Sequence, residues 1–240
     1  LTYTETYQSV ELPMDQLEQI VSLIALTMGV GWASGINLYA TVLMLGVLSN
    51  MGHITLPEEL MVVTDPLVLM AAGFMYCVEF FADKIPGVDT GWDGLHTFIR
   101  IPAGAALAAA AVGDVAPAVE VAAALVGGSL AAATHATKAG SRVLINTSPE
   151  PVSNWTASLT EDLIVLGGLW TALNSPMYFL IALAVFIVLM VWLLPKLWRA
   201  IKSVFGWIAR VFRGAEPANP SAGKISHKGD IRPSVPDSGH

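Results

Sequence analysis

The stretch PMYFLIALAVFIVLMVWLLP, residues 176–195, carries no charged side chain. A helix needs about 20 mostly apolar residues to cross a bilayer, so this segment is predicted to span a membrane. The rest of the chain agrees, because 54% of its 240 residues are hydrophobic and only 13% are charged. Soluble domains carry about 25% charged residues. The sequence therefore predicts an integral membrane protein built of helices.

Five other apolar stretches are predicted to supply the remaining crossings, and they cover residues 19–50, 66–84, 95–114, 117–137 and 155–173. The first stretch is too long for one helix and short for two, and the residues GWASGIN interrupt it. We interpret it as a hairpin of two short helices, or as a re-entrant loop, with a broken tip. The prediction is an all-α polytopic bundle with about seven crossings.

The basic residues predict the orientation, because Lys and Arg accumulate on the cytoplasmic side of membrane proteins. With the N-terminus outside, all 12 Lys and Arg residues fall inside or at the inner end of a predicted span. The outer segments then carry only acidic residues. The opposite orientation explains none of these positions, so the C-terminus is predicted to be cytoplasmic.

The chain divides into four predicted parts. Residues 1–16 are a polar extension without the basic region of a secretory signal, and translation is expected to start at its first residue or at Met14. Residues 17–195 are the membrane domain. Residues 196–213 combine apolar and basic side chains at helical spacing, which predicts an amphipathic helix on the cytoplasmic leaflet or a docking helix for a partner. Residues 214–240 are rich in Pro, Gly and Ser and are predicted to be disordered.

Charged side chains are expensive inside a membrane, so those in the spans are candidates for a functional site. Glu79 and Asp83 lie four residues apart and share one face of a helix. Two carboxylates so close need a cation, a proton or a basic side chain between them, and Lys84 and Arg100 are nearest in sequence. We interpret the pair either as a site of proton or cation coupling, or as an ion pair that holds a loop to a helix.

A second group of polar residues follows at helical spacing. His135, Lys138 and Arg142 are predicted to form a cationic edge suited to an anionic head group or metabolite. Membrane anchoring explains the two cations equally well, and a lone histidine is often a hydrogen-bonded helix residue. Glu161 and Asp162 lie too deep in their helix to cap it, so at least one should face the protein interior. The complete candidate substrate or ion site comprises Asn37, Glu79, Asp83, Lys84, Arg100, His135, Lys138, Arg142, Glu161 and Asp162.

Asp89, Asp93 and His96 are a candidate metal site. Their spacings of four and three would place three ligands for a hard divalent cation on one side of a helix. Two glycines in this run favour a turn instead, which makes Asp93 the N-cap of the span that follows. Apart from this alternative divalent cation, no cofactor is predicted.

Small residues favour close packing of two of the predicted spans. Residues 103–111 are nearly all alanine, and Gly127, Gly128 and Ser129 begin a face of small side chains. Faces of this kind let helices in a membrane approach closely.

Four stretches together carry a resemblance to a family: GINLYAT (35–41), EFFADKIPGVDTGWDGLHTFIRIPAGA (79–105), HATKAGSRVLINTSPEPVSN (135–154) and EDLIVL (161–166). They resemble the bacterial multi-pass membrane proteins grouped as domain of unknown function 4126. The resemblance covers most of residues 17–195 and implies a shared membrane domain in a bacterial inner membrane. It implies no reaction or substrate.

Three functions are compatible with these patterns. The favoured one is a small transporter or channel-like carrier with a cytoplasmic-side site made by Asn37, Glu79, Asp83, His135 and Glu161. An enzyme that acts on a lipid head group would use Asp89 and Asp93 to hold Mg²⁺, and Lys138 or Arg142 to bind phosphate. A scaffold would recruit a cytoplasmic partner through residues 196–213. The expected partners are membrane lipids, a small ion or metabolite and a second copy of the chain, whereas the net charge of −7 argues against nucleic acid.

Overall fold

A computed structural model describes residues 14–147 and 151–213. Within them the chain forms six α-helices and one 3-10 helix and no strand, so the predicted all-α class is confirmed. The chain divides into two compact units, residues 1–204 and 205–240. Most of the predicted polar extension and all of the predicted disordered tail lie outside the described residues.

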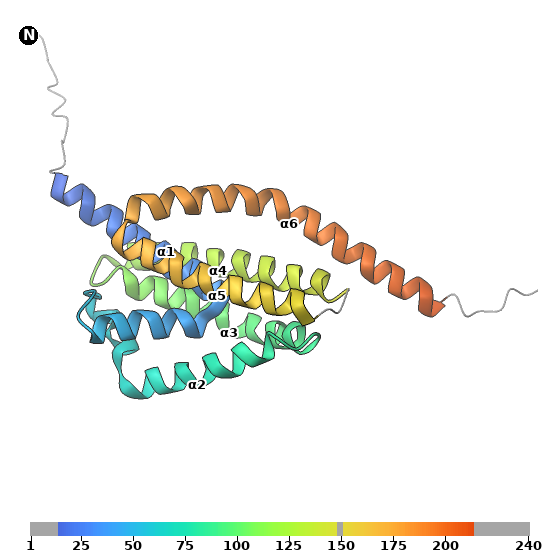
Figure 1. Cartoon of the computed structure of the whole chain (residues 1–240). Helices are drawn as coiled ribbons and strands as arrows, with labels where there is room; N and C mark the ends of the chain where they lie inside the picture. The colour runs from blue at the N-terminus through green and yellow to red at the C-terminus, as the bar shows by residue number, and fades with distance from the viewer. Residues whose placement is uncertain (1–13, 148–150, 214–240) are drawn as a thin grey trace, which may run out of the picture. The chain divides into compact units, whose positions relative to one another are not determined.

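The first helix, α1 (Met14–Asn50), is broken at Asn37, whose φ of −147° and ψ of 99° are extended rather than helical. A straight helix of 37 residues would be about 55 Å long. Instead, residues from 15 to 26 and from 53 to 57 line one pocket, and Figure 1 shows the second arm of α1 returning toward the end where the first arm began. This geometry matches the predicted hairpin, with the break inside the predicted interruption.

Asn37 also starts the second arm of α1. Its side-chain oxygen accepts a hydrogen bond of 3.0 Å from the backbone N–H of Ala40, as the side chain of a helix N-cap does. Its backbone carbonyl accepts a bond of 2.8 Å from the hydroxyl of Thr41. The same asparagine therefore interrupts one helix and caps the next.

The other elements are η1 (Glu58–Thr64), α2 (Pro66–Ala82), α3 (Val88–Ala111), α4 (Pro117–Ile145), α5 (Pro151–Asn174) and α6 (Pro176–Arg213). The connections between α2, α3, α4 and α5 are short, which favours antiparallel neighbours, and these helices alternate in direction (Figure 1). As a result, the C-terminal ends of α2 and α4, the N-terminal ends of α3 and α5, and the break in α1 meet at one end of the bundle.

Two predicted helix boundaries are wrong. α3 begins at Val88 rather than after Asp93, because Gly87 turns the chain with a φ of 85° and the Asp89 carboxylate accepts the backbone N–H of Thr90 at 2.6 Å. Asp93 is therefore inside the helix and is not its N-cap. α6 continues through Pro195 to Arg213, so residues 196–213 are helical but do not form a separate helix.

Three helices in the described part of the chain are long and apolar enough to cross a membrane: α1, α4 and residues 176–207 of α6. η1 and α2 make a fourth candidate if they count as one span, bent by 61°. These lengths agree with the predicted membrane protein. α3 and α5 are not among the candidates.

The small-residue faces of α3 and α4 pack closely, as predicted. A methyl group added at Gly128 would lie 3.0 Å from the Cβ atom of Ala105. One added at Gly31 of α1 would lie 2.6 Å from the Cα atom of Gly127, a distance that real Cβ atoms do not reach. Glycine at both positions therefore permits α1 and α3 to contact the backbone of α4.

Candidate functional site

A buried set of ion pairs fills the end of the bundle where α1 breaks. We call it the ionic network, and it joins three cations to five carboxylates: Arg100, Lys138 and Arg142 with Glu79, Asp83, Asp89, Asp93 and Glu161. The Glu161 side chain is 17% exposed, and the other seven residues are at most 5% exposed. Charges so deeply buried are stable only when paired and hydrogen-bonded.

Arg100 of α3 connects α3 to α2. One of its terminal nitrogens donates to Glu79 Oε1 at 2.5 Å, and the other donates to Asp93 Oδ1 at 3.1 Å. The fixed planar fork of the guanidinium suits two carboxylates on different helices.

Lys138 of α4 is the centre of the network. Its ammonium donates to Asp83 Oδ2 at 2.9 Å and to Glu79 Oε1 at 3.3 Å. It also donates to the backbone carbonyl of Ile36 at 3.2 Å, one residue before the break in α1. The last carbonyls of a helix have no partner within the helix. Lys138 binds one of these carbonyls at the end of the first arm, and it also binds the carboxylates of Glu79 and Asp83.

Arg142, one turn beyond Lys138, connects α4 to α5. Its guanidinium donates to both oxygens of Glu161, at 3.2 Å and 2.7 Å, in the bidentate geometry that gives strong pairing. It also donates to the backbone carbonyl of Asp83 at 3.0 Å. The three cations thus face carboxylates inside the protein rather than forming an open cationic edge.

Asp162, the neighbour of Glu161, holds the broken tip of α1. Its Oδ1 accepts a hydrogen bond of 3.1 Å from the side-chain amide of Asn37, and its Oδ2 accepts one of 3.3 Å from the hydroxyl of Tyr76. Both acidic residues of α5 therefore face other helices, as the sequence predicted for at least one of them.

The hydrogen bonds of His135 define its protonation. Arg100 donates to His135 Nδ1 at 3.2 Å, and arginine has only donors, so Nδ1 carries no proton. The Nε2–H then donates to the hydroxyl of Thr97 at 2.8 Å, which in turn donates to the carbonyl of Asp93. In this structure His135 is a neutral, hydrogen-bonded residue.

The three candidate metal ligands lie on α3 but bind different partners. Asp89 accepts the side-chain amide of Asn146 at 2.8 Å, and Asp93 accepts Arg100. His96 donates from Nδ1 to the carbonyl of Trp92, which leaves Nε2 to accept the Tyr39 hydroxyl at 3.0 Å. No group of three His, Cys, Asp or Glu side chains in the described ranges has a geometry that could hold a metal ion.

Lys84 lies beside the network but binds no carboxylate within the described part of the chain. Its ammonium donates to the carbonyl of Phe80 at 2.9 Å and to the hydroxyl of Ser158 at 3.3 Å, and it lies over the Phe80 ring. Burial lowers the pKa of this ammonium, against the effect of Asp162 and Asp83. Of the two partners predicted for Glu79 and Asp83, Arg100 pairs with Glu79, whereas Lys138 stands in the place expected for Lys84.

The ionic network has more negative than positive charge. Five carboxylates against three cations leave an excess of two negative charges when all eight are ionised, and adding Lys84 and Asp162 leaves that excess unchanged. Four buried carboxylate oxygens also have no hydrogen-bond partner among the described residues, namely Glu79 Oε2, Asp83 Oδ1, Asp89 Oδ2 and Asp93 Oδ2. Unpaired charge in a low dielectric is costly, so the network has capacity for protons or for a positively charged or hydrogen-donating ligand.

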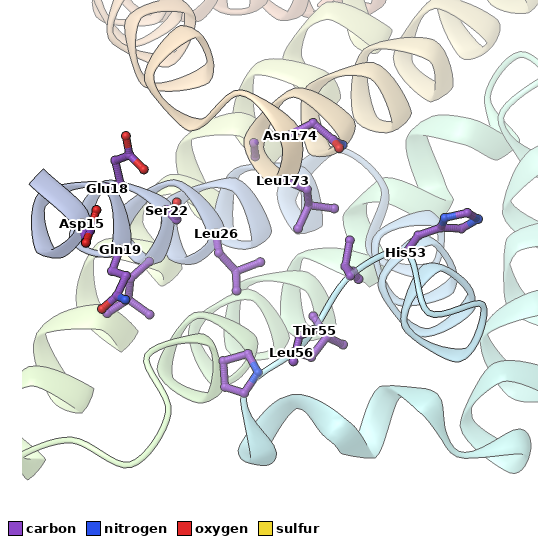
Figure 2. A pocket seen from close by; sticks show the side chains of 14 residues that line it. Asp15, Glu18, Gln19, Ser22, Leu26, His53, Thr55, Leu56, Leu173 and Asn174 are labelled. Carbon is purple, nitrogen blue, oxygen red and sulfur yellow. The ribbon is translucent and has the colours of Figure 1, made fainter.

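The opposite end of the bundle is open. A cavity of about 770 Å³, here called the vestibule, lies between the first arm of α1, residues 53–57 and the end of α5. Figure 2 shows Asp15, Glu18 and His53 at its margin and Leu26 deeper inside. A helix rises about 1.5 Å per residue, so about 16 Å of α1 separate Leu26 from Asn37, and most of the residues between them are buried.

The structure brings all ten residues of the candidate substrate or ion site to one end of the bundle. Sequence reasoning missed Tyr76, Thr97 and Ser158, which complete the hydrogen bonds of Asp162, His135 and Lys84. Helical spacing carried a signal for two of them, because Tyr76 precedes Glu79 by three residues and Thr97 follows Asp93 by four.

The fold and the site define a helical protein with membrane-length helices and a buried ionic network at a broken helix. The chain belongs to the family described as domain of unknown function (DUF4126), whose profile matches residues 24–196. The match covers the whole ionic network and leaves out most of residues 196–213. No curated protein and no solved structure matches the chain.

Proposed function

We propose that this protein is a small membrane carrier for a polar or ionic solute, with the ionic network as its binding site. The observation that carries the proposal is the position of the network at the break in α1, where Lys138 binds the carbonyl of Ile36. Carriers commonly bind their substrates and coupling ions at interrupted helices, because the interruption frees backbone groups for ligands. The net negative charge and the unpartnered oxygens of the network suit a solute that is positively charged or donates hydrogen bonds.

The proposal includes seven passes of the chain, with the two arms of α1 counted separately. The N-terminus is outside, the C-terminus is cytoplasmic and the network is on the cytoplasmic side of a bacterial inner membrane. The positive-inside rule supports this orientation, because Lys84, Lys138 and Arg142 all lie at the network end of the bundle, and eight further basic residues follow Pro195. Cysteine labelling from each side of the membrane tests it.

The vestibule supports transport rather than binding alone. It opens at the end of the bundle away from the network, and the first arm of α1 runs from one to the other. Val30 and Trp32 are buried between the two regions. This arrangement corresponds to an occluded state of a carrier, in which an apolar layer separates an open entrance from the site.

A thermal-unfolding screen of the detergent-purified protein tests the proposal. The probes are Na⁺, K⁺, Mg²⁺, Mn²⁺, amino acids, polyamines, organic acids and phosphatidylglycerol. A ligand present at 100 times its dissociation constant should raise the unfolding midpoint by roughly 5 to 10 °C. The shift should disappear in Glu79→Gln and persist in Glu120→Gln, which removes an exposed carboxylate from α4.

Uptake of the stabilising compound into proteoliposomes is the decisive measurement. Glu79→Gln or Asp83→Asn should reduce it at least about tenfold, because each loses a hydrogen bond between charged groups. Two variants are used so that a folding defect in one does not decide the result. Stabilisation by Mg²⁺ alone that disappears in Asp89→Asn would overturn the carrier in favour of an enzyme. A response to lipid alone, or no response, would overturn it in favour of a scaffold that acts through residues 196–213.

A further inference from the structure

We propose that Asp162 is a proton-binding site that controls the break in α1. This inference deepens the proposed function, on which it rests, by naming the proton as the coupling ion of the carrier. The proposal rests on a contact between two residues: Asp162 of α5, whose carboxylate has no ion pair among the described residues, accepts a hydrogen bond from Asn37, which interrupts α1.

Asp162 lacks the neighbouring cation that each of the network's carboxylates has within the described residues. Each carboxylate of the ionic network lies within 4.0 Å of at least one cation, whereas Asp162 has no such pair within the part of the chain that the structure describes. Among residues 14–147 and 151–213, its two oxygens accept hydrogen bonds only from the neutral groups of Asn37 and Tyr76. Among the acidic side chains near the network, Asp162 is therefore the one that can bind a proton without breaking an ion pair.

The surroundings of Asp162 favour neutralisation. The charged and titratable groups that act on it are Tyr76 of α2, Asp83 and Lys84 just beyond the end of α2, and Lys138 of α4. Glu161 precedes it in the sequence. The two lysines are engaged elsewhere, Lys138 with Asp83 and Glu79 and Lys84 with Phe80 and Ser158. The network already has an excess of two negative charges, so a proton on Asp162 reduces the local excess.

Protonation of Asp162 acts directly on Asn37, which is the hinge between the two arms of α1. The Asn37 side chain donates to Asp162 through Nδ2 and caps the second arm of α1 through Oδ1. When a hydronium ion transfers a proton to a carboxylate oxygen of Asp162, one O–H bond of hydronium breaks, one O–H bond forms on Asp162 and a water molecule is left. The carboxylate loses the negative charge that strengthens its hydrogen bond from the Asn37 amide, and the new O–H can donate to the oxygen of Tyr76. Asn37 is then held mainly by the hydrogen bond between its Oδ1 and the backbone N–H of Ala40. The two arms of α1 are therefore freer to move relative to each other.

Hydrogen exchange of residues 34–41, corrected for the intrinsic effect of pH, measures this coupling. In the wild-type protein the segment should exchange about tenfold faster at about pH 5 than at about pH 8, because a hydrogen bond to a charged group is lost. Asp162→Asn should exchange at the faster rate at both pH values. Glu120→Gln should keep the wild-type response.

Two further measurements keep the test decisive if Asp162→Asn folds poorly. Tyr76→Phe retains the carboxylate but removes a donor to its ionised form, so the change in exchange should move to higher pH. Infrared difference spectra between the two pH values should show the carbonyl band of a protonated carboxylic acid in the wild type, and this band should be weaker in Asp162→Asn. A pH-independent exchange rate in the wild type, or a band of undiminished intensity in Asp162→Asn, would overturn the proton site.

The outcomes separate this inference from the carrier itself. If a solute stabilises the protein and is taken up into proteoliposomes, but hydrogen exchange of residues 34–41 does not change with pH, the proton site alone is refuted. A proton-dependent hinge in a protein that binds no soluble compound would refute the carrier alone.

Discussion

The two ends of the bundle differ in whether their charged side chains are exposed or buried. At the vestibule, Asp15, Glu18 and His53 are exposed and border an open cavity. At the other end, seven of the eight charged side chains of the ionic network are buried, Glu161 is partly buried, and each of the three cations of the network pairs with two or more carboxylates. Exposed charges leave their helices free to shift, whereas buried pairs require each helix to keep its position. The stability and the specific arrangement of the fold should therefore depend on the network end far more than on the vestibule.

Removing one buried cation should have the largest effect. Arg100→Met removes the shorter ion pairs of the fully buried Glu79 and Asp93 and leaves them with Lys138, at 3.3 and 3.7 Å, and the expected loss is about 3 to 5 kcal/mol of unfolding free energy. Denaturant titration in mild detergent measures it. Arg199→Met, which removes an exposed arginine from α6, is the matched control and should cost far less. Equal losses in the two variants would show that the network does not hold the bundle together.

Crowding the contact between α1 and α4 should have the next largest effect. Gly31→Ala places a methyl group against the backbone of Gly127, and forced repacking of this kind costs about 2 kcal/mol. Gly94→Ala is the control, because that position in α3 faces open space and alanine favours a helix by about 0.5 to 1 kcal/mol. The two glycine variants should thus change the unfolding free energy in opposite directions. A stabilised Gly31→Ala would contradict the close approach of the two helices.

Interrupting the hydrogen bonds of His135 should have a moderate effect. Thr97→Val removes the acceptor of the Nε2–H, at an expected cost of about 1 kcal/mol. Nitrogen NMR of the imidazole in the wild type should show the neutral tautomer with the proton on Nε2. Thr160→Val, at an exposed threonine of α5, should leave both the stability and the spectrum unchanged. A wild-type imidazole protonated on Nδ1 would refute the arrangement around Arg100.

Neutralising the vestibule should have the smallest effect. Glu18→Gln changes an exposed side chain at the margin of the cavity (Figure 2), and such substitutions alter stability by less than about 0.5 kcal/mol. The same denaturant titration measures it. A loss comparable to that of Arg100→Met would remove the contrast between the two ends.

Much of the fold follows from hydrophobic length and local signals. Asp65 directly before Pro66 is a local signal for a helix start, and its carboxylate does cap α2 by accepting the N–H of Leu67 at 2.7 Å. The predicted interruption of the first stretch contains the break at Asn37. Helix ends were less predictable. The start of α3 depends on the turn at Gly87 and on the Asp89 side chain, and both features compete with the capping signal at Asp93.

The partners within the site could not be predicted from the sequence. Local spacing correctly placed Glu79 with Asp83 and Lys138 with Arg142. However, the pairing of Arg100 with Glu79 and of Arg142 with Glu161 joins different helices and depends on how these helices pack. The nearest cation in sequence, Lys84, binds Phe80 and Ser158 instead.

The distribution of the network over four helices, α2 to α5, has a consequence for biogenesis. α3 and α5 contribute Asp93, Arg100 and Glu161 to the network, and neither is among the helices apolar enough to cross a membrane by themselves. A helix with unpaired charges partitions poorly from the translocon into lipid. α3 should therefore stay in the insertion machinery until Lys138 of α4 emerges, whereas α5, which follows α4 in the chain, meets Arg142 already in place. Insertion of α3, α4 and α5 is then expected to be cooperative rather than a series of independent steps.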